Sequence, residues 1–198
     1  MNELVSIITP TYHCDYLPGF RRMLRSVDAQ TYHHWEHLVA SDGEHEDGIA
    51  EACAGNEQRH YHVIRPHSGH WGNGVRAALL EKAHGEYVCF LDDDDLMFPD
   101  YLEAMLGALH NSPQAAFAVC LMLHCGGSHK RGQIQPYYVS GELRVGSIGT
   151  PQIVSRTSAM QKVGWQHRER YEADGLTYQQ LGTLYPHVRV ERMLVIGL

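Results

Sequence analysis

The chain has 198 residues, enough for one sizeable core, and a net charge of −7 with its histidines neutral. This charge gives it no electrostatic reason to bind nucleic acid or an anionic membrane. No apolar run approaches the ~20 residues of a transmembrane segment, and the start lacks the basic and apolar regions of a signal peptide, so we expect a cytoplasmic protein. The five cysteines include no Cys-x-x-Cys pair, which argues against a zinc site.

Strands and helices are predicted to alternate over the first 110 residues. Short β-branched or apolar runs predict strands at residues 5–8, 37–40, 61–64 and 86–91. Apolar residues at helical spacing predict helices at residues 17–27, 49–54 and 75–84. This alternation predicts an α/β fold whose central sheet is mostly parallel, Rossmann-like and flanked by helices. The histidines at 33, 34 and 37 lie between a helix and a strand, and we expect a solvated turn there.

The second half is less regular. A helix follows Pro99, and a buried strand is expected at residues 115–124. Residues 125–135 carry three glycines and the basic pair Lys130-Arg131, and we expect a mobile loop that closes over a ligand. A strand at 151–155, helices at 158–163 and 176–184, and a strand at 188–196 complete the chain. We expect a single compact domain with a ligand-binding half at 1–110 and a second half at 111–198.

Three predicted strands end in polar residues. The ends are Thr9-Pro10-Thr11-Tyr12, Ser41-Asp42-Gly43 and the four aspartates at 92–95. Ligands of open α/β sheets bind beyond the carboxyl ends of the strands. The predicted fold therefore brings these three stretches to one crevice.

The four consecutive aspartates predict a metal site. Two carboxylates about 4 Å apart repel each other by about 1 kcal/mol even in water. A bound Mn²⁺ or Mg²⁺ would reverse that penalty, and such ions are commonly shared between carboxylates and substrate phosphates. The alternative is a solvated acidic turn that caps the helix starting near Pro99. The metal interpretation explains better why all four residues follow a buried strand directly.

With these strand ends and the aspartate cluster, the chain resembles family-2 glycosyltransferases of the GT-A fold. The resemblance is strong to about Leu109 and weaker beyond it. A second similar stretch includes Lys162-Val163-Gly164 and Asp174 with Leu181. The segments that carry the main resemblance, in chain order, are residues 5–12, 24–32, 42–43, 76, 85–88, 90–95 and 99–102.

The resemblance implies that residues 1–110 bind the nucleotide sugar and end in the Asp-rich metal motif, and that residues 111–198 form the acceptor and catalytic-base half. It thus implies a nucleotide pocket and a cation site. Pro10, Tyr12 and Asp42 fall where the family contacts the base. Arg76 falls where a basic residue approaches the nucleotide, although it could instead be a solvated helix residue. Asp92 and Asp93 would lie near the ribose and the metal, and Asp94 would be the main metal ligand.

The resemblance also implies that Asp174 is the catalytic base. An ionised Asp, with a reference pKa of about 3.9, can accept a proton at neutral pH. Gly175 follows it and would leave room for an acceptor. The alternative is that Asp174 only N-caps a helix beginning near Leu176. Glu172 is the rival base.

The function that the resemblance implies is an inverting, metal-assisted transfer of a sugar. The donor would be a nucleoside-diphosphate sugar, by default a UDP-sugar, and the acceptor a hydroxyl of a glycan or another molecule. A nucleotidyltransferase on a similar fold would want a glycine-rich, basic loop after the first strand, and residues 11–15 contain no Gly, Lys or Arg. A nucleotide-sugar-binding module without turnover is the other alternative.

Overall fold

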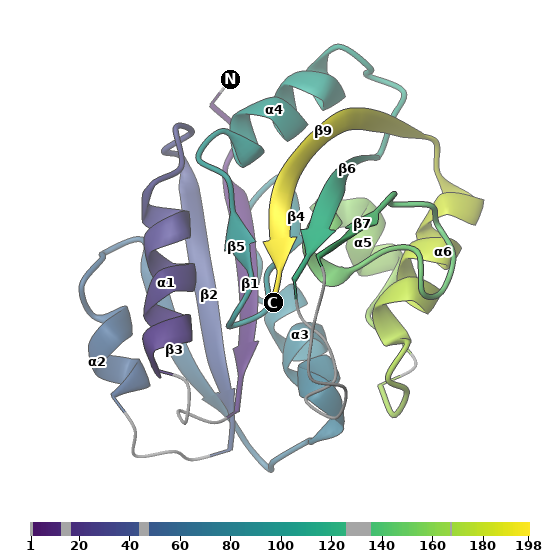
Figure 1. Ribbon diagram of the computed structural model, residues 1–198. Helices are drawn as coiled ribbons and strands as arrows, with labels where there is room; N and C mark the ends of the chain where they lie inside the picture. Colours follow the sequence, from purple (N-terminus) through teal and green to yellow (C-terminus); the bar gives the residue numbers. More distant parts are fainter. Residues whose placement is uncertain (1, 13–16, 44–47, 126–135, 167) are drawn as a thin grey trace.

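A nine-stranded sheet forms the centre of the computed structural model, which describes residues 2–12, 17–43, 48–125, 136–166 and 168–198 (Figure 1). The strands are β1 Val5–Thr11, β2 Trp35–Asp42, β3 Arg59–Ile64, β4 Tyr87–Phe90, β5 Leu96–Met97, β6 Phe117–His124, β7 Tyr137–Val139, β8 Ile153–Arg156 and β9 His187–Gly197. The α-helices are α1 Leu17–Asp28, α2 Ile49–Cys53, α3 Asn73–Leu80, α4 Tyr101–His110, α5 Thr157–Val163 and α6 Ala173–Leu184. Single 3₁₀ turns precede α3 at His70–Gly72 and β8 at Thr150–Gln152.

The sheet is parallel in its first half and mixed in its second. The strand order is β3-β2-β1-β4-β8-β6-β9-β5, with β7 pairing β6. Strands β1 to β4 pair in parallel, as the alternation of strands and helices predicted. Strand β8 is antiparallel to both β4 and β6, whereas β9 runs parallel to β6 and curls over the sheet (Figure 1). Since β4 pairs with β8, the halves 1–110 and 111–198 share one sheet, and the boundary at residue 110 stays an interpretation.

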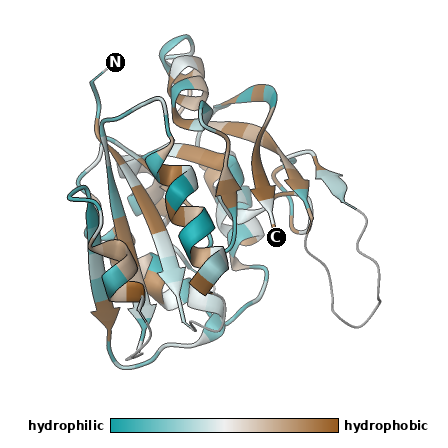
Figure 2. Ribbon diagram, turned by 60° about the vertical axis from the view of Figure 1, so that its left-hand side comes forward, coloured by the Kyte–Doolittle hydropathy of each residue, from teal (hydrophilic) through white to brown (hydrophobic). Residues whose placement is uncertain are grey.

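Helices cover both faces of the sheet and enclose two apolar clusters. Helices α1, α2 and α4 pack on one face, and α3, α5 and α6 pack on the other. Figure 2 shows hydrophobic residues concentrated in the central strands between these helix layers. In the described part of the chain, no helix has both the length and the apolar character that a membrane crossing needs.

One of the three histidines expected in a solvated turn is buried. His37 lies within β2 with no exposed surface. Its Nε2 is 2.9 Å from Thr9 Oγ1, and Arg59 Nε donates to its Nδ1 at 3.2 Å. Burial and the nearby Arg59 charge lower the pKa of His37 well below its usual value. The expectation of a solvated side chain was therefore wrong for His37, because it lies between Thr9 of β1 and Arg59 of β3.

Candidate functional site

Two adjoining cavities open at the carboxyl ends of β1, β2 and β4. The first, called here the β1–β2 cavity, has a volume of about 400 Å³. The second, the α6 cavity, measures about 520 Å³ and extends between β6, β9 and the start of α6. Trp71, Arg76, Asp92 and Asp94 line both cavities, so the two form one continuous site.

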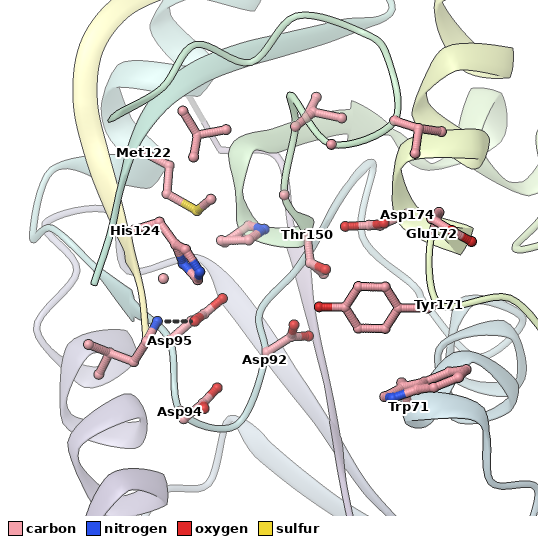
Figure 3. Close-up of a pocket in the computed structure, with 18 of the residues that line it drawn as sticks. Trp71, Asp92, Asp94, Asp95, Met122, His124, Thr150, Tyr171, Glu172 and Asp174 are labelled. Carbon is pink, nitrogen blue, oxygen red and sulfur yellow. Dashed lines mark hydrogen bonds between the residues drawn. The ribbon is translucent and has the colours of Figure 1, made fainter. Parts of the chain in front are cut away.

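All the residues singled out from the sequence line this site. The β1–β2 cavity is lined by Pro10, Tyr12, Asp42, Arg76, Asp92, Asp93 and Asp94. Asp174 lies in the α6 cavity, and in the view of Figure 3 it faces Asp94 from the opposite side. The fold thus brings together residues that are up to 164 positions apart in the chain, from Pro10 to Asp174.

The aspartate cluster turns tightly after β4. The Asp95 amide donates to the Asp92 carbonyl at 3.2 Å, which points Asp92 and Asp94 into the cavities. Burial raises the pKa of Asp93 to about 6 and raises that of Asp94, and the charges of neighbouring aspartates add to both shifts. Asp95 is buried and accepts a hydrogen bond from the Leu198 amide at 3.0 Å.

The cluster does not cap the following helix. Helix α4 begins at Tyr101, and its N-cap residue Asp100 makes no side-chain capping bond. The Asp100 carboxylate instead pairs with Arg192 of β9. The capping alternative for the cluster is therefore not supported.

The carboxylates of Asp92 and Asp94 fit a divalent cation. Both supply oxygen ligands at the junction of the two cavities, and the nearby charge of Asp92 adds to the raised pKa of Asp94. Among the described residues, no three His, Cys, Asp or Glu side chains converge on one metal position. A cation held by one or two carboxylates would complete its coordination with substrate phosphates and water.

Arg76 is buried and anchors Asp92. Its Nη2 donates to Asp92 Oδ1, and its Nη1 donates to the Trp71 carbonyl at 2.7 Å. The guanidinium also stacks over Trp165, with Cζ 5.4 Å from the ring centroid. The alternative of a solvated helix residue is wrong, because the turn before α3 and the Trp165 segment enclose the side chain. Arg76 thus sets the position of an acidic group in both cavities.

The turn before α3 has a left-handed backbone. Residues 69–72 all have positive φ, and two of them, His70 (57°) and Trp71 (55°), are not glycine. A non-glycine residue in this region costs about 1–3 kcal/mol, so the surrounding contacts must stabilise it. The bond from Arg76 to the Trp71 carbonyl is one such contact. Gly72 allows another, because a Cβ there would lie 2.7 Å from Pro10 Cβ.

Asp42 holds the loop that forms the other wall of the β1–β2 cavity. Its Oδ1 accepts hydrogen bonds from the Ser68 amide at 2.7 Å and the Ser68 hydroxyl at 2.9 Å. Its Oδ2 accepts one from the Gly69 amide at 2.7 Å. Next to it, the Tyr12 ring stacks on His67 at a centroid distance of 4.7 Å. Asp42 therefore has a structural role besides its place in the cavity, and it makes no simple Asx turn.

Asp174 lies in the first turn of α6. The helix begins at Ala173, three residues earlier than predicted, and its N-cap residue is Glu172. The N-cap role proposed for Asp174 is therefore wrong. Burial raises the pKa of Asp174 to about 6, and the charge of Asp92 adds to this rise. The Gly175 amide, which donates a hydrogen bond to Asp174 Oδ1 at 2.7 Å, lowers the pKa and so opposes the rise. The carboxylate is thus more basic than an exposed Asp and remains mostly ionised at neutral pH.

Gly175 and Glu172, which lie close to Asp174 in the chain, also shape this side of the site. Gly175 does not leave room for an acceptor, because a Cβ there would lie 2.9 Å from the Cα of Val145, so Gly175 serves close packing. Glu172 also lines the α6 cavity, but its carboxylate is 3.6 Å from Arg170 and half-exposed. Both candidate bases therefore reach the cavity and both are partly buried, and burial raises the pKa of Asp174.

Asn73 joins the two sides of the site. Its Nδ2 donates to the carbonyls of Arg168 at 3.2 Å and Arg170 at 3.0 Å. Its Oδ1 accepts from Trp165 Nε1 at 3.0 Å and from Arg76 Nη1 at 3.3 Å. Asn73 was not predicted from the sequence, although a polar residue at a helix start directly after a glycine is a signal that could have pointed to it.

The predicted lid falls almost wholly outside the described residues. The structure describes Cys125 but not residues 126–135, so closure of this loop stays a prediction.

Comparison with known proteins identifies the family. The family model described as "Glycosyl transferase family 2" matches residues 6–190. The chain belongs to glycosyl transferase family 2. Solved GT-A glycosyltransferases share its fold. The family-2 chain superimposes on Staphylococcus aureus TarS 1-349 in complex with UDP-GlcNAc with a TM-score of 0.75 at 19% identity. It superimposes on the mannosyltransferase PcManGT of Pyrobaculum calidifontis, in complex with GDP-Man and Mn²⁺, with a TM-score of 0.74 at 16% identity.

These relatives are longer than the family-2 chain. It covers 58% of the TarS chain and 57% of the PcManGT chain, while 98% and 99% of its own length is matched. An Escherichia coli relative is the UDP-Glc:alpha-D-GlcNAc-diphosphoundecaprenol beta-1,3-glucosyltransferase WfgD. It is 28% identical over 106 residues, which are 54% of this chain and 41% of WfgD. The family-2 chain thus spans less than two thirds of the length of each of these three proteins.

Proposed function

We propose that this protein is an inverting glycosyltransferase that moves a sugar from a nucleoside-diphosphate donor, UDP by default, to an acceptor hydroxyl. The observation that carries the proposal is the position of Asp174. A partly buried carboxylate, whose pKa burial raises to about 6, faces the same cavity as the acidic Asp92–Asp95 turn, from the other side. Inverting transfer needs this arrangement, since the base must act on the face of the sugar opposite the leaving group.

The donor nucleotide is proposed to bind in the β1–β2 cavity. Its stacked pair Tyr12–His67 and the wall held by Asp42 offer a flat, partly apolar surface for a base. Two relatives support a uridine nucleotide, since TarS was solved with UDP-GlcNAc and WfgD is named for UDP-Glc. PcManGT was solved with GDP-Man, so the base itself is part of the proposal to be tested.

A divalent cation is proposed to assist the reaction. Asp94 would be its main protein ligand, with Asp92 beside it, and PcManGT was solved with Mn²⁺. A cation at this position supplies charge that stabilises the departing diphosphate. The role of Arg76 is to hold Asp92 in a fixed orientation for this site.

Asp174 is proposed as the general base. It would accept the proton of the acceptor hydroxyl while the hydroxyl oxygen bonds to the anomeric carbon. The bond from that carbon to the diphosphate oxygen breaks at the same time, and its electron pair leaves with the diphosphate. A base is most effective when its pKa is near the working pH, and burial moves Asp174 in that direction.

A panel of nucleotide sugars tests the proposal directly. The purified protein is incubated with UDP-, GDP- and dTDP-sugars, with Mn²⁺ or with EDTA, and the released nucleoside diphosphate is measured with and without saccharide acceptors. We expect release from a UDP-sugar that depends on Mn²⁺ and increases with an acceptor. Tight donor binding without release would instead identify a binding module. Release of pyrophosphate from a nucleoside triphosphate would identify a nucleotidyltransferase.

A further inference from the structure

Two exposed aromatic side chains meet at the mouth of the α6 cavity. Trp71 is 60% exposed and Tyr171 is 72% exposed, although each is a large hydrophobic residue. Their ring centroids lie 5.4 Å apart with an interplanar angle of 77°. In the view of Figure 3, the Tyr171 ring points into the cavity between Trp71 and the acids Glu172 and Asp174.

The rings of Trp71 and Tyr171 do not stack but meet edge to face, and this pair is called here the corner. Since the rings are nearly perpendicular, one ring offers a face and the other an edge to a molecule that enters the cavity. Large aromatic side chains are usually buried, and exposed apolar surface next to a cavity commonly marks a binding site. The α6 cavity behind the corner lies beyond the β1–β2 cavity, where the donor nucleotide is proposed to bind; Trp71 lines both cavities, whereas Tyr171 lines only the α6 cavity.

The corner is held in place from both sides. Trp71 has the left-handed backbone described above, and its carbonyl accepts a hydrogen bond from Arg76. Tyr171 follows Arg170, whose carbonyl accepts a hydrogen bond from Asn73. A strained backbone that the surrounding contacts maintain is typical of functional positions. The backbone on both sides of the corner is therefore held by contacts that need no ligand.

The groups beside the corner indicate the ligand. Glu172 and Asp174 supply carboxylate oxygens, and Thr150 supplies a hydroxyl. A pyranose ring matches this surface, because its C–H face is apolar and its hydroxyls at the rim are hydrogen-bond donors. We propose that Trp71 and Tyr171 form the subsite that binds the terminal sugar ring of a saccharide acceptor and presents its hydroxyl to Asp174. This inference rests on the proposed function, and it narrows the acceptor from any hydroxyl-bearing molecule to a cyclic sugar.

The protein contains its own probe for this subsite. Of its three tryptophans, Trp35 is 4% exposed and Trp165 is 2% exposed, so the fluorescence accessible to acrylamide comes from Trp71. Acrylamide quenching is measured with UDP and Mn²⁺ present, during titration with cellobiose or N,N′-diacetylchitobiose. Ribitol and glycerol serve as controls that carry hydroxyls but no ring. We expect the two disaccharides to protect Trp71 and the ringless polyols to leave quenching unchanged.

Variants of Tyr171 test the aromatic contact. Tyr171→Ala should bind the protecting disaccharide about two- to tenfold more weakly, the usual effect of losing an aromatic contact. Tyr171→Phe, which keeps the ring and loses the hydroxyl, should bind it like the wild type. Both variants should bind UDP normally, because Tyr171 does not line the β1–β2 cavity. Melting curves confirm that the variants fold.

Each contrary outcome overturns the inference. Protection by UDP alone, with no further effect of a disaccharide, would assign Trp71 to the nucleotide pocket. Equal protection by ribitol would show that hydroxyls, not a ring, are recognised. The absence of protection by either disaccharide, or an equal loss in Tyr171→Phe and Tyr171→Ala, would also refute it. Because the readout is binding, it does not depend on turnover, and a failure of the proposed transferase activity would appear separately in the donor panel.

Discussion

Replacing Asp174 should raise stability and abolish most activity at the same time. The folded pKa of Asp174 is about 6, against a reference value of 3.8. Since one pKa unit corresponds to 1.36 kcal/mol, the ionised carboxylate destabilises the fold by about 3 kcal/mol at neutral pH. Asp174→Asn removes this charge and keeps an oxygen for the Gly175 amide. We therefore expect a gain of up to about 3 kcal/mol, or roughly 6–12 °C in Tm.

The stability gained by Asp174→Asn should depend on pH. A group whose folded pKa is raised stabilises the fold when it is protonated, and this stabilisation is lost as the pH rises through about 6. The advantage of Asp174→Asn over the wild type should thus be complete above about pH 7 and vanish below about pH 4. Chemical denaturation at pH 8 and pH 4 measures it. Wild-type turnover should fall below about pH 6, as the base becomes protonated.

Turnover of Asp174→Asn should be about 10²–10⁴-fold slower, the usual cost of losing a general base. It is measured as nucleoside-diphosphate release with donor and acceptor saturating. Glu172→Gln is the matched control, because Glu172 lines the same cavity and is half-exposed. Since Glu172 lies in the proposed acceptor subsite, Glu172→Gln should weaken acceptor binding, but with the acceptor saturating it should slow turnover far less than Asp174→Asn does. If Asp174→Asn keeps its rate while Glu172→Gln loses it, the base is Glu172. A loss of stability in Asp174→Asn at pH 8 would contradict the electrostatic reasoning.

Two further substitutions test the donor side of the site. Asp94→Asn should weaken UDP binding in the presence of Mn²⁺ more than in EDTA. The control Asp100→Asn, whose carboxylate pairs with Arg192 outside the cavities, should not weaken it. Equal UDP affinities of the wild type with Mn²⁺ and with EDTA would refute the cation site. Asp42→Ala removes three hydrogen bonds to Ser68 and Gly69, so we expect a loss of about 3 kcal/mol or more in the free energy of unfolding together with weaker UDP binding. Ser68→Ala, which removes only the hydroxyl bond, should lose about 1 kcal/mol, and an Asp42→Ala variant of wild-type stability would show that the loop does not depend on this carboxylate.

The first half of the fold could be predicted because its signals are local. Strands β1, β2 and β4 each contain a short apolar run, and each ends at or just before residues that line the β1–β2 cavity. The parallel arrangement follows from the alternation alone. Strands β5 and β7 were not predicted, since they have two and three residues and depend on pairing with β9 and β6. No periodic pattern can appear in segments this short.

The errors in the site have a common cause, which is burial by distant segments. Arg76 could be a solvated helix residue as far as the sequence shows, and only the fold places Trp165 against it. Asp42 could be a turn residue, until the loop at Ser68 is brought to its carboxylate. The shifted pKa of Asp174 likewise needs the enclosing cavity. Trp71 and Tyr171 lie in irregular segments, so their meeting at the cavity has no counterpart in the sequence pattern.

The hydrogen bonds of Asn73 bear on any attempt to exchange acceptor specificity between proteins of this family. A natural graft would take the segment that carries Tyr171 and Asp174 from one protein and insert it in another. In this chain, that segment is attached to the start of α3 through the carbonyls of Arg168 and Arg170 and through Trp165 Nε1, all of which bond to one amide side chain. A transplanted segment that lacks an equivalent of Trp165 would leave the buried Asn73 oxygen with only the longer hydrogen bond from Arg76, at 3.3 Å. The proposed acceptor site would then be less well aligned with the donor side. Chimeras should therefore be cut so that both ends of this attachment come from the same parent.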